Sequence, residues 1–311
     1  MSNDETSNFL TSQINLSNKV KHSPKVTIGM LAFNGEKTIE KAINSLLFQT
    51  FKDFELIISN DASTDRTGII CEKFALEDSR INYICQDKNI GEFPNSVFLL
   101  NRAKGKYFMW AADDDWRSPD FLMSNVIALD QNSRFVASTS PSCYEGEENM
   151  KNRHVNFNLK GTTKDRYKVF LENAWNSHGI YYSLMRTEIA KKYKNLNSFY
   201  AANDWSFNFY LITRGQINRS EHGLLVLGKN GQSRRNNPWK YYRNNFIEIF
   251  LPLYEFSKYA LSLMTDLKLY ERLIVYVSLL KLNFQSIKSN LRFTIRDLIE
   301  KKKYEQNNKK I

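Results

Sequence analysis

The chain has 311 residues, of which 42% are apolar, and its formal net charge at pH 7 is +11. This apolar content excludes disorder for most of the chain, and the length suggests one large domain with an appendage. The three cysteines form no CxxC pair and the four histidines show no metal-ligand spacing, which argues against a disulfide framework and a zinc hydrolase. The charge implies an anionic partner: nucleic acid, a phosphorylated substrate or an acidic membrane surface.

Residues 1–24 are rich in Asn, Ser and Thr and lack the apolar stretch of a secretory signal, so we expect a disordered polar tail. No uninterrupted apolar run reaches the ~18 residues that a membrane-spanning helix needs. We therefore expect a chain that is not threaded through a membrane. The unpaired cysteines favour a reducing, cytoplasmic setting.

From Lys25 onward, buried strands alternate with amphipathic helices. Apolar runs predict strands at residues 26–32, 54–59, 81–85 and 106–111, and helical spacing predicts helices that begin near residues 39, 64 and 95. Ser118 has the character of an N-cap with Pro119 in the first helical position, which predicts a further helix to about residue 130. This alternation predicts a mostly parallel sheet covered by helices on both faces, an α/β fold of Rossmann-like type.

The second half of the chain is less regular. We predict a strand at 180–184, a helix at 205–213 and a strand at 224–227. Beyond Asn236, aromatic and aliphatic residues recur at helical spacing between Lys and Arg. Such helices either pack against the main domain or a partner subunit, or lie on an anionic bilayer as basic amphipathic helices.

Polar residues follow three of the predicted strands. Asn34 and Asp61 come just after the first two strands, and the run Asp113-Asp114-Asp115 follows the fourth. Open parallel sheets bind ligands beyond the carboxyl ends of their strands, so we expect these segments to converge on one crevice.

The acidic run admits two interpretations. Three adjacent carboxylates repel one another, and a hard divalent cation such as Mg²⁺ or Mn²⁺ would neutralise them while binding phosphate oxygens of a ligand. Alternatively, the run is an acidic loop before the helix that Pro119 begins. Asp61 likewise either accepts hydrogen bonds from a nucleobase or ribose, or is a turn residue.

Several motifs occur in the order typical of one enzyme family. After the strand and turn at 26–34, the segment Ser45-Leu46-Leu47-Phe48-Gln49-Thr50 and residues 54–65 resemble the signature "S-L-x-Q-T … E-I-I-V-D-D-G-S-T-D". Asn89-Ile90-Gly91, Asn95 and residues 103–107 resemble the approach to a metal motif. Over about residues 26–121 the chain resembles the family 2 glycosyltransferases of bacterial glycan assembly, which are inverting enzymes of the GT-A fold.

Four positions depart from the family pattern: Asn60 and Ala62 replace an Asp and a Gly, Pro94 stands where Arg is usual, and Ala112 replaces the first Asp of D-x-D-D. When residues are counted back from Pro119, Asp114 aligns with the metal ligand.

The resemblance implies a role for individual residues. Asn203-Asp204-Trp205 is similar to the family's "E-D-W" motif, which makes Asp204 the expected catalytic base, although a helix-capping role is an alternative. Asp114 and Asp115 are expected to bind Mn²⁺ or Mg²⁺, and His178 and Trp205 to approach the acceptor. The residues expected to bind the nucleotide-sugar are Ala32, Phe33, Asn34, Glu36, Asp61, Asn89, Gly91, Asn95, Asp113 and Arg234, of which Arg234 is alternatively a solvated side chain.

The resemblance also implies an organisation and a reaction. We expect a GT-A domain at 25–235, with a nucleotide-sugar half at 25–130 and an acceptor half at 131–235, and a helical region at 236–311. The expected reaction moves a sugar, most simply from a UDP-sugar, to a glycan or lipid-linked acceptor at the inner face of the membrane. A nucleotidyltransferase and a non-catalytic binding subunit stay open as alternatives, as does the oligomeric state. No GxGxxG turn supports a dehydrogenase, and no nucleic-acid recognition motif is present.

Overall fold

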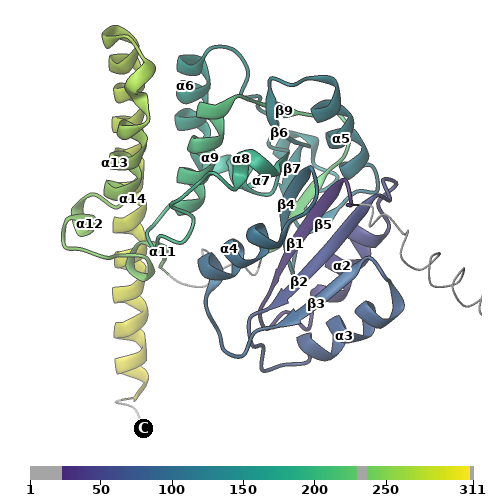
Figure 1. Cartoon of the computed structure of the whole chain (residues 1–311). Coiled ribbons are helices and arrows are strands. Elements are labelled where there is room, and N and C mark those ends of the chain that lie inside the picture. The colour runs from purple at the N-terminus through teal and green to yellow at the C-terminus, as the bar shows by residue number, and fades with distance from the viewer. Residues whose placement is uncertain (1–22, 230–236, 309–311) are drawn as a thin grey trace, which may run out of the picture.

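The computed structural model describes residues 23–229 and 237–308 (Figure 1). Its centre is a seven-stranded sheet in the order β3-β2-β1-β4-β8-β6-β9. The strands are β1 (Val26–Ala32), β2 (Phe54–Asn60), β3 (Ile81–Cys85), β4 (Tyr107–Ala112), β6 (Phe135–Thr139), β8 (Leu184–Arg186) and β9 (Gln216–Arg219). β8 pairs antiparallel with β4 and β6, whereas the other pairs of this sheet are parallel. The expected mostly parallel sheet is confirmed.

Helices cover both faces of the sheet, as Figure 1 shows. On one face, α2 (Ile39–Leu47), α3 (Thr67–Glu77) and α5 (Phe121–Gln131) bury apolar side chains with Met109. On the other face, α4 (Glu92–Arg102), α6 (Thr163–Asn173) and α9 (Asn203–Arg214) pack with Phe108 and Trp110. Successive residues of β4 thus enter opposite cores, because side chains alternate across a strand.

A small second sheet lies beside the acidic run. It consists of β5 (Trp116–Arg117), β10 (Leu225–Leu227) and β7 (Ser142–Tyr144), with β10 in the middle. β10 pairs antiparallel with β5 and parallel with β7. The predicted strand at 224–227 is confirmed by β10. The pairing holds the residues after β4 next to the residues after β10.

Two predicted elements are wrong in detail. The helix predicted from Ser118 begins instead at Phe121, because Trp116 and Arg117 form β5 and Ser118 continues that pairing: its N–H donates to the Leu224 carbonyl at 3.0 Å. The strand predicted at 180–184 is instead the short helix α7 (His178–Tyr181), with β8 beginning at Leu184. Its apolar residues are buried in either case, so the run did not distinguish helix from strand.

The helix predicted from residue 95 begins three residues earlier. α4 starts at Glu92, directly after Gly91, whose φ of 89° lies in the region that glycine adopts most easily. Pro94 sits in the first turn, where a missing N–H leaves no helical hydrogen bond unmade.

The remaining described elements are mostly short. They are η1 (Lys151–Arg153), η2 (Ala174–Asn176), α8 (Thr187–Ala190), α11 (Pro238–Tyr241), α12 (Ile247–Phe250), α13 (Tyr254–Ser262) and η3 (Met264–Asp266), followed by the 40-residue helix α14 (Leu269–Asn308). The predicted helical character beyond residue 236 is confirmed for the described residues. Within residues 23–229 and 237–308, no helix is both long and apolar enough to cross a membrane.

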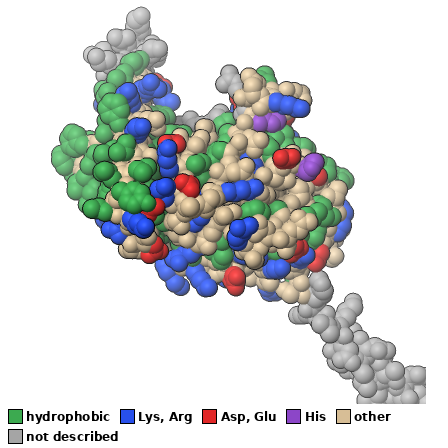
Figure 2. Space-filling view, turned by 90° about the horizontal axis from the view of Figure 1, so that it is seen from above, with side chains coloured by type: hydrophobic (Ala, Val, Ile, Leu, Met, Phe, Trp, Pro, Cys, Tyr) green, Lys and Arg blue, Asp and Glu red, His purple; other side chains and the backbone are tan. Residues whose placement is uncertain are grey.

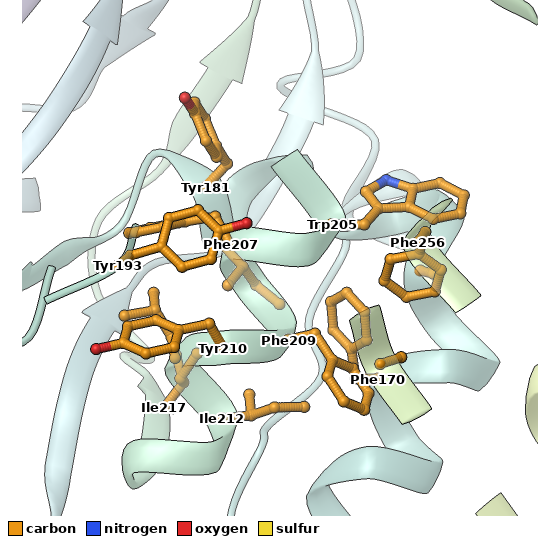
Figure 3. Close-up of a cluster of buried hydrophobic side chains, with 14 of the residues drawn as sticks. Phe170, Tyr181, Tyr193, Trp205, Phe207, Phe209, Tyr210, Ile212, Ile217 and Phe256 are labelled. Atoms are coloured by element: carbon orange, nitrogen blue, oxygen red, sulfur yellow. The ribbon is translucent and has the colours of Figure 1, made fainter. Parts of the chain in front are cut away.

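An aromatic core fixes α9 in place. Figure 3 shows Trp205 beside Phe256 of α13, with Phe209 and Phe170 next to them. The ring centroids of Trp205 and Phe256 lie 6.0 Å apart, and those of Phe209 and Phe170 lie 5.8 Å apart, both in edge-on arrangements that aromatic rings favour. Because the rings pack from three helices, the first turn of α9 is held rigidly. Asp204 lies in that turn.

Candidate functional site

The carboxyl ends of β1, β2 and β4 meet at one edge of the sheet. In the strand register, Ala32 lies opposite Asn60, and Leu31 lies opposite Ala112. The residues that follow these strands therefore emerge side by side, and the backbone N–H of Phe33 donates to Oδ2 of Asp113 at 2.9 Å. The predicted convergence of three segments on one edge is confirmed.

The loop after β1 is joined to the loop after β2 by side chains. Asn34 Oδ1 accepts from the N–H of Thr64 at 2.8 Å, and the Asn34 N–H donates to Ser63 Oγ at 3.0 Å. Glu36 Oε2 accepts from the N–H of Arg66 at 3.2 Å. Asn34 and Glu36 thus hold the loops after β1 and β2 together.

Asp61 is buried and holds the loop before α4. Its two carboxylate oxygens accept from the N–H groups of Ile90 at 2.7 Å and Gly91 at 2.9 Å. A carboxylate has about four acceptor positions, so these two bonds leave capacity for a ligand. Asn89, in the same loop, is exposed.

Asn95 is 1% exposed and stands just behind that loop. Its Nδ2 donates to the Ser59 carbonyl at 3.2 Å, while its Oδ1 is buried without a hydrogen-bond partner. Asn95 therefore ties α4 to the end of β2, close to Asp61.

The acidic run divides into residues with different surroundings. Asp115 is 3% exposed, and burial raises the pKa of its carboxyl to about 7, although Arg117 acts in the opposite direction. Its Oδ1 accepts from the N–H of Gly228 at 3.1 Å, and its Oδ2 is buried without a hydrogen-bond partner. Gly228 also packs directly against the Asp114 side chain.

These oxygens suit a hard cation. Mg²⁺ and Mn²⁺ prefer oxygen ligands, and Mg²⁺ typically takes one or two protein carboxylates and completes its shell with waters and substrate phosphates. The unpaired Oδ2 of Asp115 and the carboxylate of Asp114 fit such a set. Among the described residues, no group of three or more His, Cys, Asp or Glu side chains could hold a metal by itself.

Backbone strain marks the loops of this region. The three non-glycine residues with positive φ in the described part of the chain are Asn34 at 52°, Ala62 at 55° and Ala202 at 65°. Ala62 follows Asp61, and Ala202 is the N-cap of α9, two residues before Asp204. Such conformations cost of order 1 to 3 kcal/mol each and cluster at functional sites.

A cavity of about 420 Å³ lies around Asp204. His178 Nδ1 lies 3.9 Å from Asp204 Oδ2 at its wall. Burial raises the pKa of Asp204 to about 6, against hydrogen bonds from the N–H groups of Trp205 and of Asp204 itself. A carboxyl with this pKa is ionised at neutral pH and is a stronger base than an ordinary Asp.

The cavity holds a second carboxyl, which the sequence interpretation missed. Glu92 lines it, and burial together with the negative charge of Asp204 raises the pKa of Glu92 to about 7. Tyr242 Oη approaches Glu92 Oε2 at 3.5 Å. The sequence carried no signal for Glu92 beyond its place after Gly91.

Aromatic side chains form most of the cavity wall. Trp175 and Trp205 meet edge-on, with ring centroids 5.2 Å apart, and Trp175 lies 6.0 Å from Trp239. The other aromatic wall residues are Phe93, Tyr144, Tyr181, Tyr182, Tyr200, Tyr242 and Phe293. Trp205 was predicted to lie at the acceptor side, whereas the contributions of residues 239–293 were not foreseen.

The C-terminal helix α14 completes this wall. Ser289 and Phe293 of α14 line the cavity, and Trp239 Nε1 donates to Ser289 Oγ at 3.1 Å. Trp175 Nε1 donates to Gln285 Oε1 of α14 at 3.0 Å. The cavity is therefore shared between the sheet domain and the C-terminal helices.

Tyr182 connects the two groups of candidate residues. It lines the cavity, and its pKa is raised well above the ordinary value by burial and by the charges of Asp115 and Glu92. Tyr144, another wall residue, lies opposite Leu227 in the register of β7 and β10, one residue before Gly228, whose N–H binds Asp115. The cavity wall and the carboxylates after β4 are thus joined through the second sheet. Arg234 lies outside the described residues.

Comparison with known proteins gives a consistent result. The family described as "Glycosyl transferase family 2" matches residues 27–194. GlyA of Streptococcus pneumoniae, a glycosyltransferase, is 26% identical over 175 residues, which are 56% of this chain and 24% of GlyA. The GalNAc(5)-diNAcBac-PP-undecaprenol beta-1,3-glucosyltransferase of Campylobacter jejuni is 28% identical over 183 residues, 57% of this chain and 56% of that enzyme.

A solved structure shares the fold. Residues 1–349 of TarS from S. aureus, in complex with UDP-GlcNAc, superpose with a TM-score of 0.54 and 19% identity, covering 83% of this chain and 80% of that one. The chain spans less than two thirds of the length of the curated relatives named above.

Proposed function

Because the chain belongs to glycosyl transferase family 2, we propose that it transfers a sugar from a nucleoside-diphosphate donor to an acceptor hydroxyl, with inversion. One observation carries the proposal: carboxylates at the carboxyl edge of the sheet adjoin a cavity that contains a carboxyl with a raised pKa. A donor at the sheet edge and an acceptor in the cavity would bring the two reacting groups together.

In this reaction Asp204 takes the proton from the acceptor hydroxyl. The hydroxyl oxygen forms a bond to the anomeric carbon of the sugar, and the bond from that carbon to the diphosphate breaks on the opposite face. The raised pKa of Asp204 suits a general base, which typically accelerates a reaction by about 10² to 10⁴-fold. His178 and Trp205 position the acceptor beside the carboxylate.

At the donor side, Asp61, Asn95 and the loop at Gly91 are proposed to bind the nucleoside, with Asp113 at the ribose. Asp114 and Asp115 are the residues that would hold a divalent ion, which supplies positive charge to the departing diphosphate. The ion is proposed to be Mn²⁺ or Mg²⁺, because both prefer oxygen ligands. Arg234 is proposed to add charge at the diphosphate.

The donor is proposed to be a UDP-sugar, because TarS is described with UDP-GlcNAc and shares the fold. The acceptor is proposed to be a glycan or a lipid-linked glycan. A cavity walled by tryptophan and tyrosine suits the apolar faces of sugar rings, since aromatic side chains bury a large apolar area while their polar atoms stay hydrogen bonded.

A screen of nucleotide-sugars tests the proposal. The protein with Mn²⁺ is incubated with UDP-, GDP- and dTDP-sugars, and release of the nucleoside diphosphate is measured. We expect release from one donor class and its collapse in Asp204→Asn, with donor binding retained. Glu92→Gln is the matched control: if it abolishes turnover while Asp204→Asn does not, Glu92 is the base. If the parent protein binds a donor but neither it nor any variant shows turnover, the result would favour a non-catalytic binding subunit.

A further inference from the structure

Helix α14 presents two different apolar faces. One face is buried against the rest of the protein, with Val275 0% and Leu282 1% exposed. On the opposite face five apolar side chains are 57% to 67% exposed; they are Leu273, Leu280, Phe284, Leu291 and Leu298. Because these residues are spaced by four or seven, they form one line along the helix, named here the outer line.

Exposed aromatic side chains also lie at α12, beside α14. Phe246, just before α12, is 73% and Phe250 is 62% exposed, and Asn290 Nδ2 of α14 donates to the Ile249 carbonyl of α12 at 2.9 Å. Figure 2 shows hydrophobic side chains gathered over one side of the molecule. Monomeric soluble proteins rarely expose apolar patches of more than a few hundred Å², and larger ones mark contacts with partners or membranes.

Basic residues border the outer line on one side. At ~100° per residue, Lys281, Lys288 and Arg292 border the line on one side. The Lys288 ammonium lies 4.4 Å from the centroid of the Phe284 ring, so this cation reaches over the apolar face itself. Of the acidic residues of α14, Glu271, Asp297 and Glu300 project about 120° or more away from the line, and Glu305 follows Leu298 by seven residues at the end of the helix.

This arrangement decides between two occupants. If a second copy packed along the same line, Lys281 and Lys288 would face the same border of an antiparallel partner or the opposite border of a parallel one. Between residues 273 and 298 neither border holds an acidic residue to pair with them. An anionic lipid surface satisfies both features, because it takes apolar side chains between its acyl chains and cations at its head groups. We infer that the outer line of α14 and the exposed face of α12 lie on an anionic bilayer.

If the proposed function holds, the membrane-facing surface also indicates which class of acceptor the protein uses. Ser289 and Phe293, on the inner side of α14, line the cavity that contains Asp204. A helix is about 10 to 12 Å across, so a helix lying on the bilayer keeps the cavity about that far from the lipid head groups. The acceptor is then a glycan anchored in the membrane by a lipid, and the donor is a soluble nucleotide-sugar.

Vesicle co-sedimentation of the full chain tests the surface. We expect binding to vesicles that contain phosphatidylglycerol, little binding to phosphatidylcholine alone, and weakening by salt. The double variants Leu280→Glu/Leu291→Glu and Lys281→Glu/Lys288→Glu should each bind at least about tenfold more weakly. Leu76→Glu is the matched control, because Leu76 is 90% exposed on α3 and far from the outer line in sequence; it should bind as the parent does.

Two readouts separate the possible failures. Circular dichroism and UDP titration are made on every variant, so a misfolded variant is recognised and the donor site is judged independently. Binding that is unchanged in the Leu280→Glu/Leu291→Glu variant, or absent with anionic vesicles, overturns the inference. A stable dimer in sedimentation velocity that this variant dissociates would assign the outer line to a second copy. If the parent protein does not bind UDP, the proposed function is refuted instead.

Discussion

Gly228 and Asp114 pack against each other without room for a side chain between them. A Cβ atom at position 228 would overlap the Asp114 carboxylate, and the N–H of Gly228 donates to Asp115 Oδ1 at 3.1 Å. The residue after β10 therefore sets the position of two carboxylates that follow β4. These segments lie more than 100 residues apart, so the contact depends on the small second sheet.

Gly228→Ala should weaken metal-dependent UDP binding and also lower stability. The added methyl would lie 2.7 Å from Asp114 Cβ as well as against the carboxylate, so turning the side chain does not make room and the backbone has to shift, which misplaces the ligand. We expect at least about a tenfold loss of affinity, which corresponds to about 1.4 kcal/mol. Calorimetric titration with Mn²⁺ measures the affinity, and urea unfolding provides the control. Unchanged affinity would mean that Asp114 does not act where we place it.

Transfer should depend on pH through Asp204. Its pKa is raised to about 6, and a general base works in its ionised form, so the rate should reach a plateau above pH 7 and fall about tenfold by pH 5. Initial rates across this range, with saturating donor, check the expectation. A profile that stays flat from pH 5 to pH 8 would contradict the assignment of Asp204 as the base.

Asp204→Asn should stabilise the protein at alkaline pH. The folded-state pKa lies above the ordinary 3.8, so the folded protein binds this proton more tightly than the unfolded chain, and ionisation of Asp204 lowers stability as the pH rises from about 4 to 6. Asn carries no charge. The variant should therefore unfold at higher urea concentration than the parent at pH 8, and this difference should shrink at pH 4. If the variant is less stable than the parent at pH 8, the ionised Asp204 carboxylate is stabilised by its surroundings, which would contradict the raised pKa.

Ala62→Gly should stabilise the fold. Ala62 has φ 55°, a conformation that costs a non-glycine residue about 1 to 2 kcal/mol, and glycine recovers part of this after its larger loss of entropy on folding. We expect a gain of up to about 1 kcal/mol in urea unfolding. Ala128→Gly, inside α5, is the opposite control and should lose about 1 kcal/mol. UDP binding should persist in both.

Phe293→Ala should impair use of the acceptor and leave the donor site intact. Phe293 reaches the cavity from α14, so its loss removes apolar contact area from the proposed acceptor pocket. We expect about a tenfold rise in the KM for acceptor, in the range of one lost apolar contact. Glu300→Ala, on the same helix in an exposed pair with Arg296, should change nothing. A change in UDP affinity would place Phe293 elsewhere in the mechanism.

The sequence predicted the convergence at the sheet edge well because that convergence is built from local patterns. Each of Asn34, Asp61 and Asp113 follows an apolar strand directly, and parallel strands bring their carboxyl ends to the same edge. The position of Ala62 was also informative: it stands where the family signature has Gly, and its φ is positive. Local sequence patterns were thus sufficient to predict this edge of the sheet.

The cavity was harder to predict because it depends on distant segments. Trp239 meets Ser289, and Trp175 meets Gln285, across 50 and 110 residues of sequence. The spacing of apolar residues predicted helices beyond residue 236, but it did not show which side of α14 would pack against the rest of the protein. Glu92 was missed for a related reason: its pKa is raised by burial and by the charge of Asp204, and no local pattern connects Glu92 with the residues that surround it. Ser118 was wrongly predicted to be a helix N-cap. Its hydroxyl accepts from the N–H of Leu224 and its own N–H donates to the Leu224 carbonyl, just before β10.

Calorimetric titration of UDP, with and without Mn²⁺, into the parent protein and Asp114→Ala is the most direct test of the proposed metal-assisted site. We predict that the parent binds UDP and that Mn²⁺ strengthens this binding, because Asp114 and Asp115 hold the ion against the diphosphate. We also predict that Asp114→Ala loses the Mn²⁺-dependent part while remaining folded. UDP binding that is indifferent to Mn²⁺, or retained in full by Asp114→Ala, would contradict a metal-assisted glycosyltransferase site at this edge of the sheet.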